Sequence, residues 1–366
     1  MISALGAIAE SRGLDAVIIV APDNVEYFTG IPTIGDATLM LIYEKKDNHF
    51  SLYVPLLEYY RYRHSAPSTI DVIGVSRALK PPDIPVVELD WGEILAKYKG
   101  LGKIGVDASH TSSLQVTVQR VLGDQVVDVS RDVWRVRMIK SAEEVKSIEV
   151  ATRITLRGIL AVCSGLREDI TETSLTGVFE KAVRDQGAER LAFDPIIAFK
   201  PTNSYPHALP GTRKLGKRNL VLVDVGVKYR GRCSDVTRMV LWGKPRGDER
   251  KSVEAVVEAL EAAVDSIKPG VKANEVYEVA AKVLEKHGLR EKFIHGLGHG
   301  VGVVVHEPPY LRRGEEIVLE PGMVFTVEPG VYFAGDYGVR VEEVVLVTKR
   351  GARVLSSKLE KVLAAL

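Results

Sequence analysis

The chain has 366 residues, a formal net charge of +1 at pH 7, and 27% charged residues. This length is sufficient for two domains with a large core. The balanced charge, without a stretch that combines basic and aromatic residues, excludes nucleic acid as a partner. The two cysteines, Cys163 and Cys233, are too few for a disulfide framework and indicate a reducing, cytoplasmic compartment. No signal peptide or membrane segment is expected, because charged residues soon interrupt the apolar N-terminus.

Residues 1–130 are predicted to form an α/β domain. Helical patterns alternate there with short apolar segments that are typical of strands in a mainly buried sheet. These segments are Ala16–Val20, Thr38–Tyr43, Ser51–Val54 and Lys103–Val106.

The second domain is predicted to cover residues 131–366. Its boundary falls between Asp128 and Ser141, and Ser141 with Glu144 forms a capping box. This signal predicts a long helix that ends near Cys163.

The second domain contains a weak internal repeat, in which residues 166–187 align with residues 267–288. In each copy a helix ends, a short turn follows, and a second helix ends at a glycine. The matched positions are Ile170 and Val271 in the turn, Thr173 and Asn274 as predicted N-caps, and Gly187 and Gly288 at the end. Two strands that carry carboxylates follow each copy. A duplication about a pseudo-twofold axis would bring these distant carboxylates together.

Four carboxylates in the last third of the chain interrupt or adjoin apolar segments that are typical of buried strands. They are Asp224 in segment 221–226, Asp235 before segment 236–241, Glu328 in segment 325–330 and Glu342 in segment 339–345. A buried carboxylate costs several kcal/mol unless it is paired or binds a metal. Taken singly, each could pair with an arginine such as Arg238 or Arg340, or face solvent. Their conjunction with the glycine-flanked His299 favours a shared site for divalent metals.

The residue types of this set indicate which metals to expect. One imidazole and four carboxylates without a thiolate favour Mn or Co, with Fe or Zn as alternatives, over a structural zinc ion. Four carboxylates exceed the charge of one divalent ion, so two ions that share bridging carboxylates are expected. Such two-metal sites activate water and polarise carbonyl or phosphoryl groups, which predicts a hydrolase.

The segments around these positions resemble the motifs of the pita-bread metallopeptidases, specifically the proline peptidases prolidase and aminopeptidase P. The matching segments are VDVG at 223–226, SDVTR at 234–238, GLGHGVG at 296–302, VEPG at 327–330 and GVRVE at 338–342. The segment NVEYFTG at 24–30 resembles the first domain of that family. The resemblance implies an α/β (α+β) chain, with an N-terminal creatinase-like α/β domain and a C-terminal pita-bread domain that has a pseudo-twofold internal repeat.

The resemblance also implies a role for each candidate residue. Asp224 would bind one metal, Asp235 and Glu342 would bridge both, and His299 with Glu328 would complete the second. Glu328 would also shuttle the proton of the attacking water, because a ligand carboxylate already reaches it. His207 and His306 would hydrogen-bond the scissile carbonyl and the developing oxyanion. Without the resemblance, each of these two histidines would be interpreted as a turn or strand-end residue with a structural hydrogen bond.

The activity that the resemblance implies is hydrolysis of the peptide bond before proline by an Xaa-Pro dipeptidase. Its substrate would be a small peptide with proline at the second position. The resemblance further implies a homodimer, in which residues 31–36 could approach the partner's active site.

Two departures from the family pattern leave the substrate length open. Tyr310, followed by Arg312 and Arg313, stands where many prolidases place an Arg that holds the substrate carboxylate. Lys200 and Pro201 replace residues of the Ser-Gly type. An Xaa-Pro aminopeptidase that acts on longer peptides is therefore an alternative.

Two rivals belong to other classes. One is a non-catalytic binding protein on the same fold. The other is a metal-independent hydrolase of C–N bonds in small amidino compounds. Both would lack stoichiometric metal.

Overall fold

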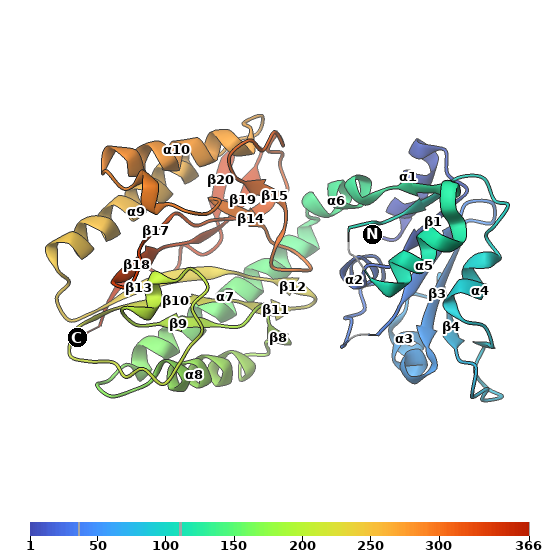
Figure 1. Cartoon of the computed structure of the whole chain (residues 1–366), viewed down its shortest axis with the longest axis horizontal. Helices are drawn as coiled ribbons and strands as arrows, with labels where there is room; N and C mark the ends of the chain where they lie inside the picture. Colours follow the sequence, from blue (N-terminus) through green and yellow to red (C-terminus); the bar gives the residue numbers. More distant parts are fainter. Residues whose placement is uncertain (36, 110–111, 366) are drawn as a thin grey trace. The chain divides into compact units, whose positions relative to one another are not determined.

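The computed structural model describes residues 1–35, 37–109 and 112–365. Within it the chain divides into two compact units, Met1–Arg137 and Met138–Leu366 (Figure 1). The boundary predicted at residues 130/131 stays a prediction; it lies at the start of α6 (Ser130–Met138). No helix among the described residues is both long enough and apolar enough to cross a bilayer.

The N-terminal unit is built on a mixed seven-stranded sheet with the order β5-β4-β3-β2-β1-β6-β7. The strands are β1 (Ala16–Ile19), β2 (Met40–Glu44), β3 (His49–Pro55), β4 (Ile70–Val75), β5 (Val86–Val87), β6 (Ile104–Val106) and β7 (Val126–Asp128). All four residues of β1 are buried, as expected for a central strand that is covered on both faces. The four predicted strands of this domain are confirmed, with small shifts at their ends.

Helices cover this sheet. They are α1 (Ser3–Arg12), α2 (Pro22–Thr29), α3 (Tyr59–Ser65), α4 (Trp91–Ala96) and α5 (Ser113–Leu122), with the 3-10 helices η1 (Leu56–Glu58) and η2 (Gly123–Gln125). Ile94 of α4 and Val118 of α5 belong to one buried cluster with Ile18 and Ile42 of the sheet. The predicted α/β character of this unit is confirmed.

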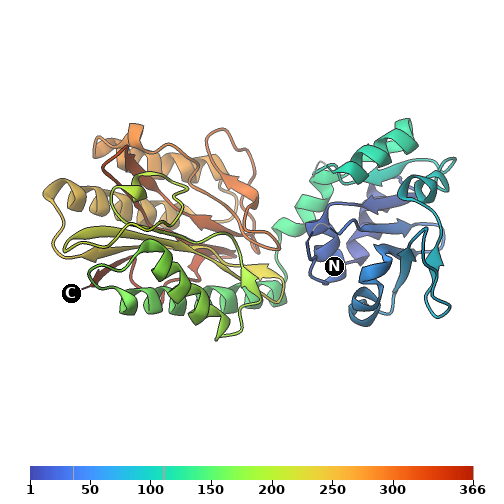
Figure 2. The ribbon, with the colours of Figure 1, turned by 60° about the horizontal axis from the view of Figure 1, so that its bottom comes forward.

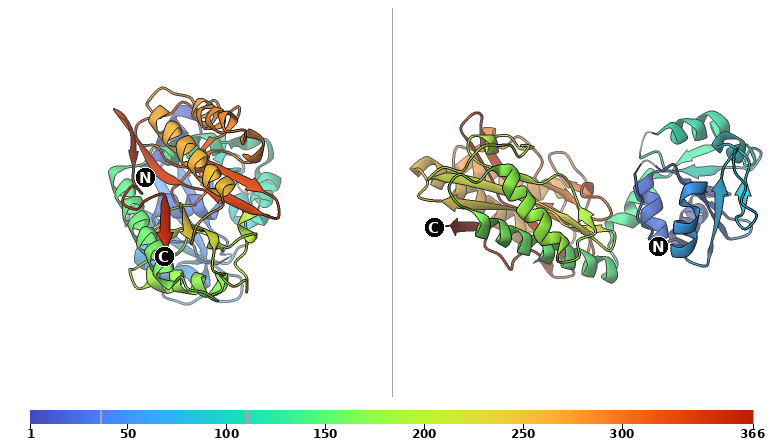
Figure 3. Two further views of the ribbon diagram at one scale, coloured as in Figure 1. Left: turned by 90° about the vertical axis from the view of Figure 1, so that its left-hand side faces the viewer. Right: turned by 90° about the horizontal axis from the view of Figure 1, so that it is seen from below.

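Two helical pairs frame the strands of the C-terminal unit, as the ribbon views show (Figures 1, 2 and 3). One pair is α7 (Ala142–Gly165) with α8 (Glu172–Arg184), and the other is α9 (Gly247–Ser266) with α10 (Ala273–Lys286). The predicted capping box opens α7: the Ser141 N–H donates to Glu144 Oε2 at 2.9 Å, and the Glu144 N–H donates to Ser141 Oγ at 3.3 Å.

The strands between these helices form several small sheets. The two larger sheets are β21-β13-β10-β9 and β15-β14-β16-β19-β20. Both contribute to two cores, one with α7 and α8 and the other with α9 and α10; Val221 and Val223 of β10, for example, belong to the first core, and Leu220 and Leu222 to the second. A hairpin of β17 and β18 and the small sheet β12-β11-β8 complete the unit. The elements are β8 (Arg190–Leu191), β9 (Ile196–Ala198), η3 (Thr202–Ser204), β10 (Asn219–Val225), β11 (Val227–Tyr229), β12 (Arg232–Cys233), β13 (Val236–Trp242), η4 (Arg290–Lys292), β14 (Gly298–Gly300), β15 (Glu307–Leu311), β16 (Val324–Val327), β17 (Gly330–Phe333), β18 (Tyr337–Arg340), β19 (Glu343–Thr348), β20 (Gly351–Val354) and β21 (Val362–Ala365).

The internal repeat is confirmed, but its predicted N-caps are wrong. The caps are Thr171 for α8 and Lys272 for α10, two residues before the predicted positions. The reason is the same in both halves, because a neighbouring loop satisfies the first-turn N–H groups. The Thr173 N–H donates to Gly211 O at 3.1 Å, and the Asn274 N–H donates to Glu315 O at 3.1 Å. The glycines that end both helices, Gly187 and Gly288, have φ values of 89° and 70°, as the left-handed C-terminal turn requires.

Candidate metal centre

The first half of the C-terminal unit places two of the candidate carboxylates at one end of an antiparallel strand pair. Asp224 is the penultimate residue of β10, as predicted, and it lies opposite Thr237 of β13. Asp235 directly precedes β13. Both side chains therefore lie at the same end of this pair, where the strand register brings them together.

The second half repeats this arrangement at two strand breaks. Glu328 and Glu342 were predicted inside continuous strands, and this prediction is wrong. Strand β16 ends just before Glu328, and β19 begins just after Glu342. Pro329 lacks the N–H that a further hydrogen bond of the sheet would need, which ends the first strand. The Glu342 N–H donates to Thr237 O at 3.2 Å, so the chain leaves its partner strand at this point.

The flanking glycines of His299 are required by close backbone contacts. A Cβ atom on Gly298 would lie 2.0 Å from Thr326 O, and one on Gly300 would lie 2.3 Å from Pro308 O. Only glycine allows β14 to approach its neighbours this closely. The sequence Gly-His-Gly thus inserts the imidazole between strands that carry the carboxylates.

The hydrogen bonding of His299 fixes which nitrogen faces the cluster. Its Nδ1 lies 3.3 Å from Gly300 O, and since a carbonyl can only accept, Nδ1 carries the proton. The Nε2 atom lies 3.2 Å from Glu328 Oε1 and 3.6 Å from Asp235 Oδ2. Burial would lower the pKa of His299, but the hydrogen bond and charge of Glu328 outweigh it and raise this pKa. A metal ion at Nε2 would take the place of the proton there, because a metal ligand needs the neutral ring with its lone pair on this nitrogen.

The predicted ligand residues come together in three overlapping groups. In each group, one potential ligand atom per residue lies within 4.8 Å of the others. The groups are Asp224, Asp235 and Glu342; His299, Glu328 and Glu342; and Asp235, His299 and His306. The five residues of the predicted metal set are thus adjacent, and His306 borders them.

Unsatisfied oxygen atoms show that this cluster fits cations. Among residues 1–35, 37–109 and 112–365, Asp224 Oδ1, Asp235 Oδ1 and Glu342 Oε1 are buried and have no hydrogen-bond partner. Buried polar atoms of this kind are rare and costly in native structures. Carboxylate oxygens beside an imidazole are the donors that Mn, Co, Fe or Zn ions accept.

The proton affinities of the carboxylates point to the same conclusion. Burial and then the charge of Glu342 raise the pKa of Asp235 well above its usual value. Burial and the charge of Glu328 do the same to the pKa of Glu342. Burial would also raise the pKa of Glu328, but the hydrogen bond and charge of His299 outweigh it and lower this pKa to about 2. Divalent cations would relieve this mutual repulsion.

Two threonines orient the carboxylates, and the sequence analysis missed both. The Thr237 hydroxyl donates to Glu342 Oε2 at 2.8 Å, and the Thr326 hydroxyl donates to Glu328 Oε1 at 3.3 Å. Each threonine lies two positions from a candidate ligand, Asp235 or Glu328. Side chains two apart on a strand share a face, so this spacing could have identified them.

The two carboxylate oxygens of Asp224 differ in their contacts. One fits the ion pair with an arginine and the other fits the metal ligand that its sequence suggested. One carboxylate oxygen pairs with Arg340, while the other has no partner among the described residues. The Arg340 Nη1 also donates to the Tyr332 hydroxyl at 2.5 Å, and this hydroxyl lies 3.1 Å from Nε2 of His295. The sequence analysis did not identify His295 or Tyr332. The other arginine considered as a partner, Arg238, pairs instead with Glu343 at 3.1 Å.

A cavity of about 900 Å³ opens over the cluster. His207 and His306 both line it, and neither ring hydrogen-bonds to another described residue. The rings of His306 and His299 lie 4.2 Å apart between centroids. Burial and the neighbouring His299 lower the pKa of His306 to about 4, so its ring is neutral at pH 7. Both histidines are therefore available to a ligand in the cavity.

Apolar side chains form part of the cavity wall, and one departure from the family pattern also lines the cavity. The apolar residues include Phe193, Ile196, Leu209 and Ile294. Tyr310 and Arg312 also line the cavity, with the Arg312 guanidinium 4.9 Å from the centre of the Tyr310 ring. The Arg312 side chain is 59% exposed, and its ion pair with Glu315 is long, at 3.5 Å.

Comparisons with known proteins agree with this architecture. Residues 146–349 match Metallopeptidase family M24, and residues 1–139 match the Creatinase/Prolidase N-terminal domain. The chain is 32% identical to the Xaa-Pro dipeptidase of Pyrococcus furiosus over 352 residues, 95% of this chain and 94% of that protein.

Solved structures show the same likeness. The prolidase from Pyrococcus horikoshii OT3 superposes with a TM-score of 0.87 at 29% identity, covering 98% of this chain and 99% of that one. The X-Pro aminopeptidase from Thermotoga maritima MSB8 also gives a TM-score of 0.87, at 26% identity, covering 100% and 99%. The predicted family and fold are confirmed: this chain belongs to metallopeptidase family M24 and carries the Creatinase/Prolidase N-terminal domain.

Proposed function

We propose that this protein is a dinuclear metal-dependent Xaa-Pro dipeptidase. The observation that carries the proposal is the group of buried, unpartnered carboxylate oxygens beside His299, under an open cavity with an apolar wall. The relatives named Xaa-Pro dipeptidase and prolidase support the choice of substrate.

In this proposal Asp224 holds one ion, Asp235 and Glu342 bridge two, and His299 with Glu328 completes the second site. Mn or Co is the expected metal, with Fe or Zn as alternatives, because the donors are hard oxygens and one imidazole. When bound, the two ions would activate a water molecule and polarise the scissile carbonyl.

The side chains around the cluster would supply the remaining functions. Glu328 would shuttle the proton of the attacking water, because a carboxylate that holds the ion already reaches that water. His207 and His306 would donate hydrogen bonds to the scissile carbonyl and to the charge that develops on it, which is usually the largest catalytic contribution. The apolar wall with Ile196 and Leu209 would pack against the proline ring.

Arg312 is our candidate for the residue that binds the substrate carboxylate. It replaces the arginine that is absent at Tyr310, and stacking on the Tyr310 ring holds it in the cavity wall. A cation at this place favours a dipeptide, whose carboxylate lies on the proline itself. The alternative remains an Xaa-Pro aminopeptidase, as the likeness to the X-Pro aminopeptidase of Thermotoga maritima indicates.

The assembly and location complete the proposal. We expect a cytoplasmic homodimer, in which the segment from Ile31 approaches the partner's active site. The last residue of that segment, Asp36, lies outside the described residues.

Adjacent glutamates provide a matched test of the metal ligands. Glu342→Gln should weaken Mn²⁺ binding by at least ~100-fold, the upper end of the loss from removing an outer-shell partner. Glu343→Gln alters an equally buried carboxylate that pairs with Arg238, so it should lower stability but keep the metal stoichiometry. Elemental analysis and calorimetric titration of chelated, reloaded protein measure both. Equal metal retention by the two variants would remove Glu342 from the ligand set.

The substrate class is tested by hydrolysis of Met-Pro, Met-Ala and Met-Pro-Gly, before and after Mn²⁺ or Co²⁺ is added to chelated protein. The proposal predicts metal-dependent cleavage of Met-Pro alone. Cleavage of Met-Pro-Gly as well would change the assignment to an aminopeptidase. Stoichiometric metal without cleavage of any peptide would contradict the proposal. Absence of metal would favour a binding protein or a metal-independent hydrolase.

Neighbouring arginines test the carboxylate site. Arg312→Gln should raise the KM for Met-Pro by about tenfold with little change in kcat, because a half-exposed charge-assisted hydrogen bond to the substrate is lost. Arg313→Gln is the control, since Arg313 does not line the cavity. Steady-state kinetics give the KM for Met-Pro of both variants. An unchanged KM for Arg312→Gln would exclude Arg312 as the residue that binds the substrate carboxylate.

A further inference from the structure

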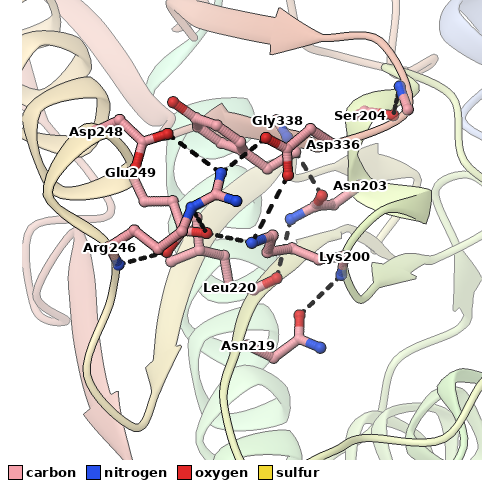
Figure 4. Close-up of polar contacts among 12 residues, drawn as sticks. Lys200, Asn203, Ser204, Asn219, Leu220, Arg246, Asp248, Glu249, Asp336 and Gly338 are labelled. Carbon is pink, nitrogen blue, oxygen red and sulfur yellow. Dashed lines mark hydrogen bonds and ion pairs between the residues drawn. The ribbon is translucent and has the colours of Figure 1, made fainter.

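The departure at Lys200 marks a cluster of charged side chains outside the cavity lining (Figure 4). The Lys200 ammonium pairs with Glu249 near the start of α9 and lies 3.9 Å from Asp336 in the turn of the β17–β18 hairpin. Its side chain is 16% exposed, and that of Glu249 is 2% exposed. A partly buried ammonium thus joins three segments that are distant in the sequence.

Arg246 completes the cluster from the start of α9. Its Nη2 donates to Asp336 Oδ2 at 2.7 Å and to Asp248 Oδ2 at 3.2 Å. Its backbone N–H donates to Glu249 Oε2 at 2.6 Å. The two cations and three carboxylates hold the tip of the hairpin, the start of α9 and the segment after β9 together. We call these five residues, Lys200, Arg246, Asp248, Glu249 and Asp336, the Lys200 cluster.

The segment that follows Lys200 is attached to the same hairpin at two more points. The Gly338 N–H donates to Asn203 Oδ1 at 3.2 Å, and the Gly335 N–H donates to Ser204 Oγ at 3.2 Å. A Cβ on Gly338 would lie 2.2 Å from Asn203 O, so the segment lies directly against β18. The position of this segment therefore depends on the position of the hairpin.

The β17–β18 hairpin and the segment attached to it both reach the candidate metal centre. The hairpin begins two residues after Glu328 and ends two residues before Glu342. The attached segment ends at His207, whose ring makes no hydrogen bond to the described part of the chain. Next to it, Pro206 O accepts a hydrogen bond from Arg340 Nη2 at 3.2 Å. No hydrogen bond to the described residues fixes the His207 ring, so the place of the ring depends on the backbone of its segment.

We propose that Lys200 is a positioning residue, which acts through the Lys200 cluster to hold His207 at a fixed place relative to Glu328 and Glu342. The expected loss of activity rests on the proposed function, whereas the expected release of residues 200–207 does not. Loss of the ammonium leaves the buried Glu249 carboxylate with Arg246 alone and releases residues 200–207 from α9. The metal ligands keep their own contacts, so metal binding stays intact while the hydrogen bond from His207 weakens.

A double-mutant cycle with Met-Pro as substrate and Mn²⁺-loaded protein tests this coupling. Lys200→Met should lower kcat/KM by about tenfold in the wild-type background and by less than about twofold in a His207→Ala background. Lys200→Arg should restore most of the activity. The control is Lys361→Met, because Lys361 also pairs with a glutamate of α9, Glu261, at 2.9 Å. Metal stoichiometry should be unchanged in every variant.

A second measurement does not depend on activity. Hydrogen exchange of peptides from residues 199–209 should be faster in Lys200→Met than in the wild type and in Lys361→Met. If Lys200→Met does not fold, Asp336→Asn replaces it, because the Asp336 side chain is 47% exposed and belongs to the same cluster.

The outcomes distinguish a failure of the positioning role of Lys200 from a failure of the proposed function. An equal loss of kcat/KM in both backgrounds, or unchanged exchange of residues 199–209, overturns the positioning role of Lys200. If the wild type cleaves no proline peptide, the proposed function fails, and the exchange measurement alone decides whether Lys200 holds the segment.

Discussion

The repulsion among buried carboxylates is the constraint on which the rest of the C-terminal unit depends. Two like charges 4 Å apart repel by about 4 kcal/mol at the effective dielectric constant of a partly buried site. The three triads of ligand atoms lie within 4.8 Å, and three of their oxygens have no partner among the described residues. A fold that keeps Asp224, Asp235, Glu328 and Glu342 together gains nothing from them unless cations bind there.

Two features of the fold bring the carboxylates together: a similar arrangement in both halves, and breaks in the strands of the second half. Each half ends an antiparallel strand pair with two carboxylates, and the second half interrupts its strands at Glu328 and Glu342. The hairpin between these breaks joins both glutamates to the Lys200 cluster at its tip, and through it to the segment of His207. Glu328, Glu342 and the segment of His207 therefore belong to one connected backbone unit and not to independent loops.

The sequence predicted the residues of the site better than their backbone. A carboxylate within an apolar segment is visible without a structure, so Asp224, Asp235, Glu328 and Glu342 could be identified; their roles as ligands stay proposals. The strand breaks could not, because they depend on partner changes such as the bond from Glu342 N–H to Thr237 O. The caps of α8 and α10 were misplaced because distant loops satisfy their first turns. Likewise, the sequence shows Lys200 only as a departure from the family pattern, because α9 and the hairpin bring Glu249 and Asp336 to it only in the fold.

The most direct test of the central claim is anomalous diffraction from crystals of the Mn²⁺-loaded protein. We predict two anomalous peaks over the carboxylate cluster, both in contact with Asp235 and Glu342. One should also contact Asp224, and the other should contact His299 and Glu328. A single peak, or peaks away from these residues, would contradict the dinuclear site on which the proposed function is built.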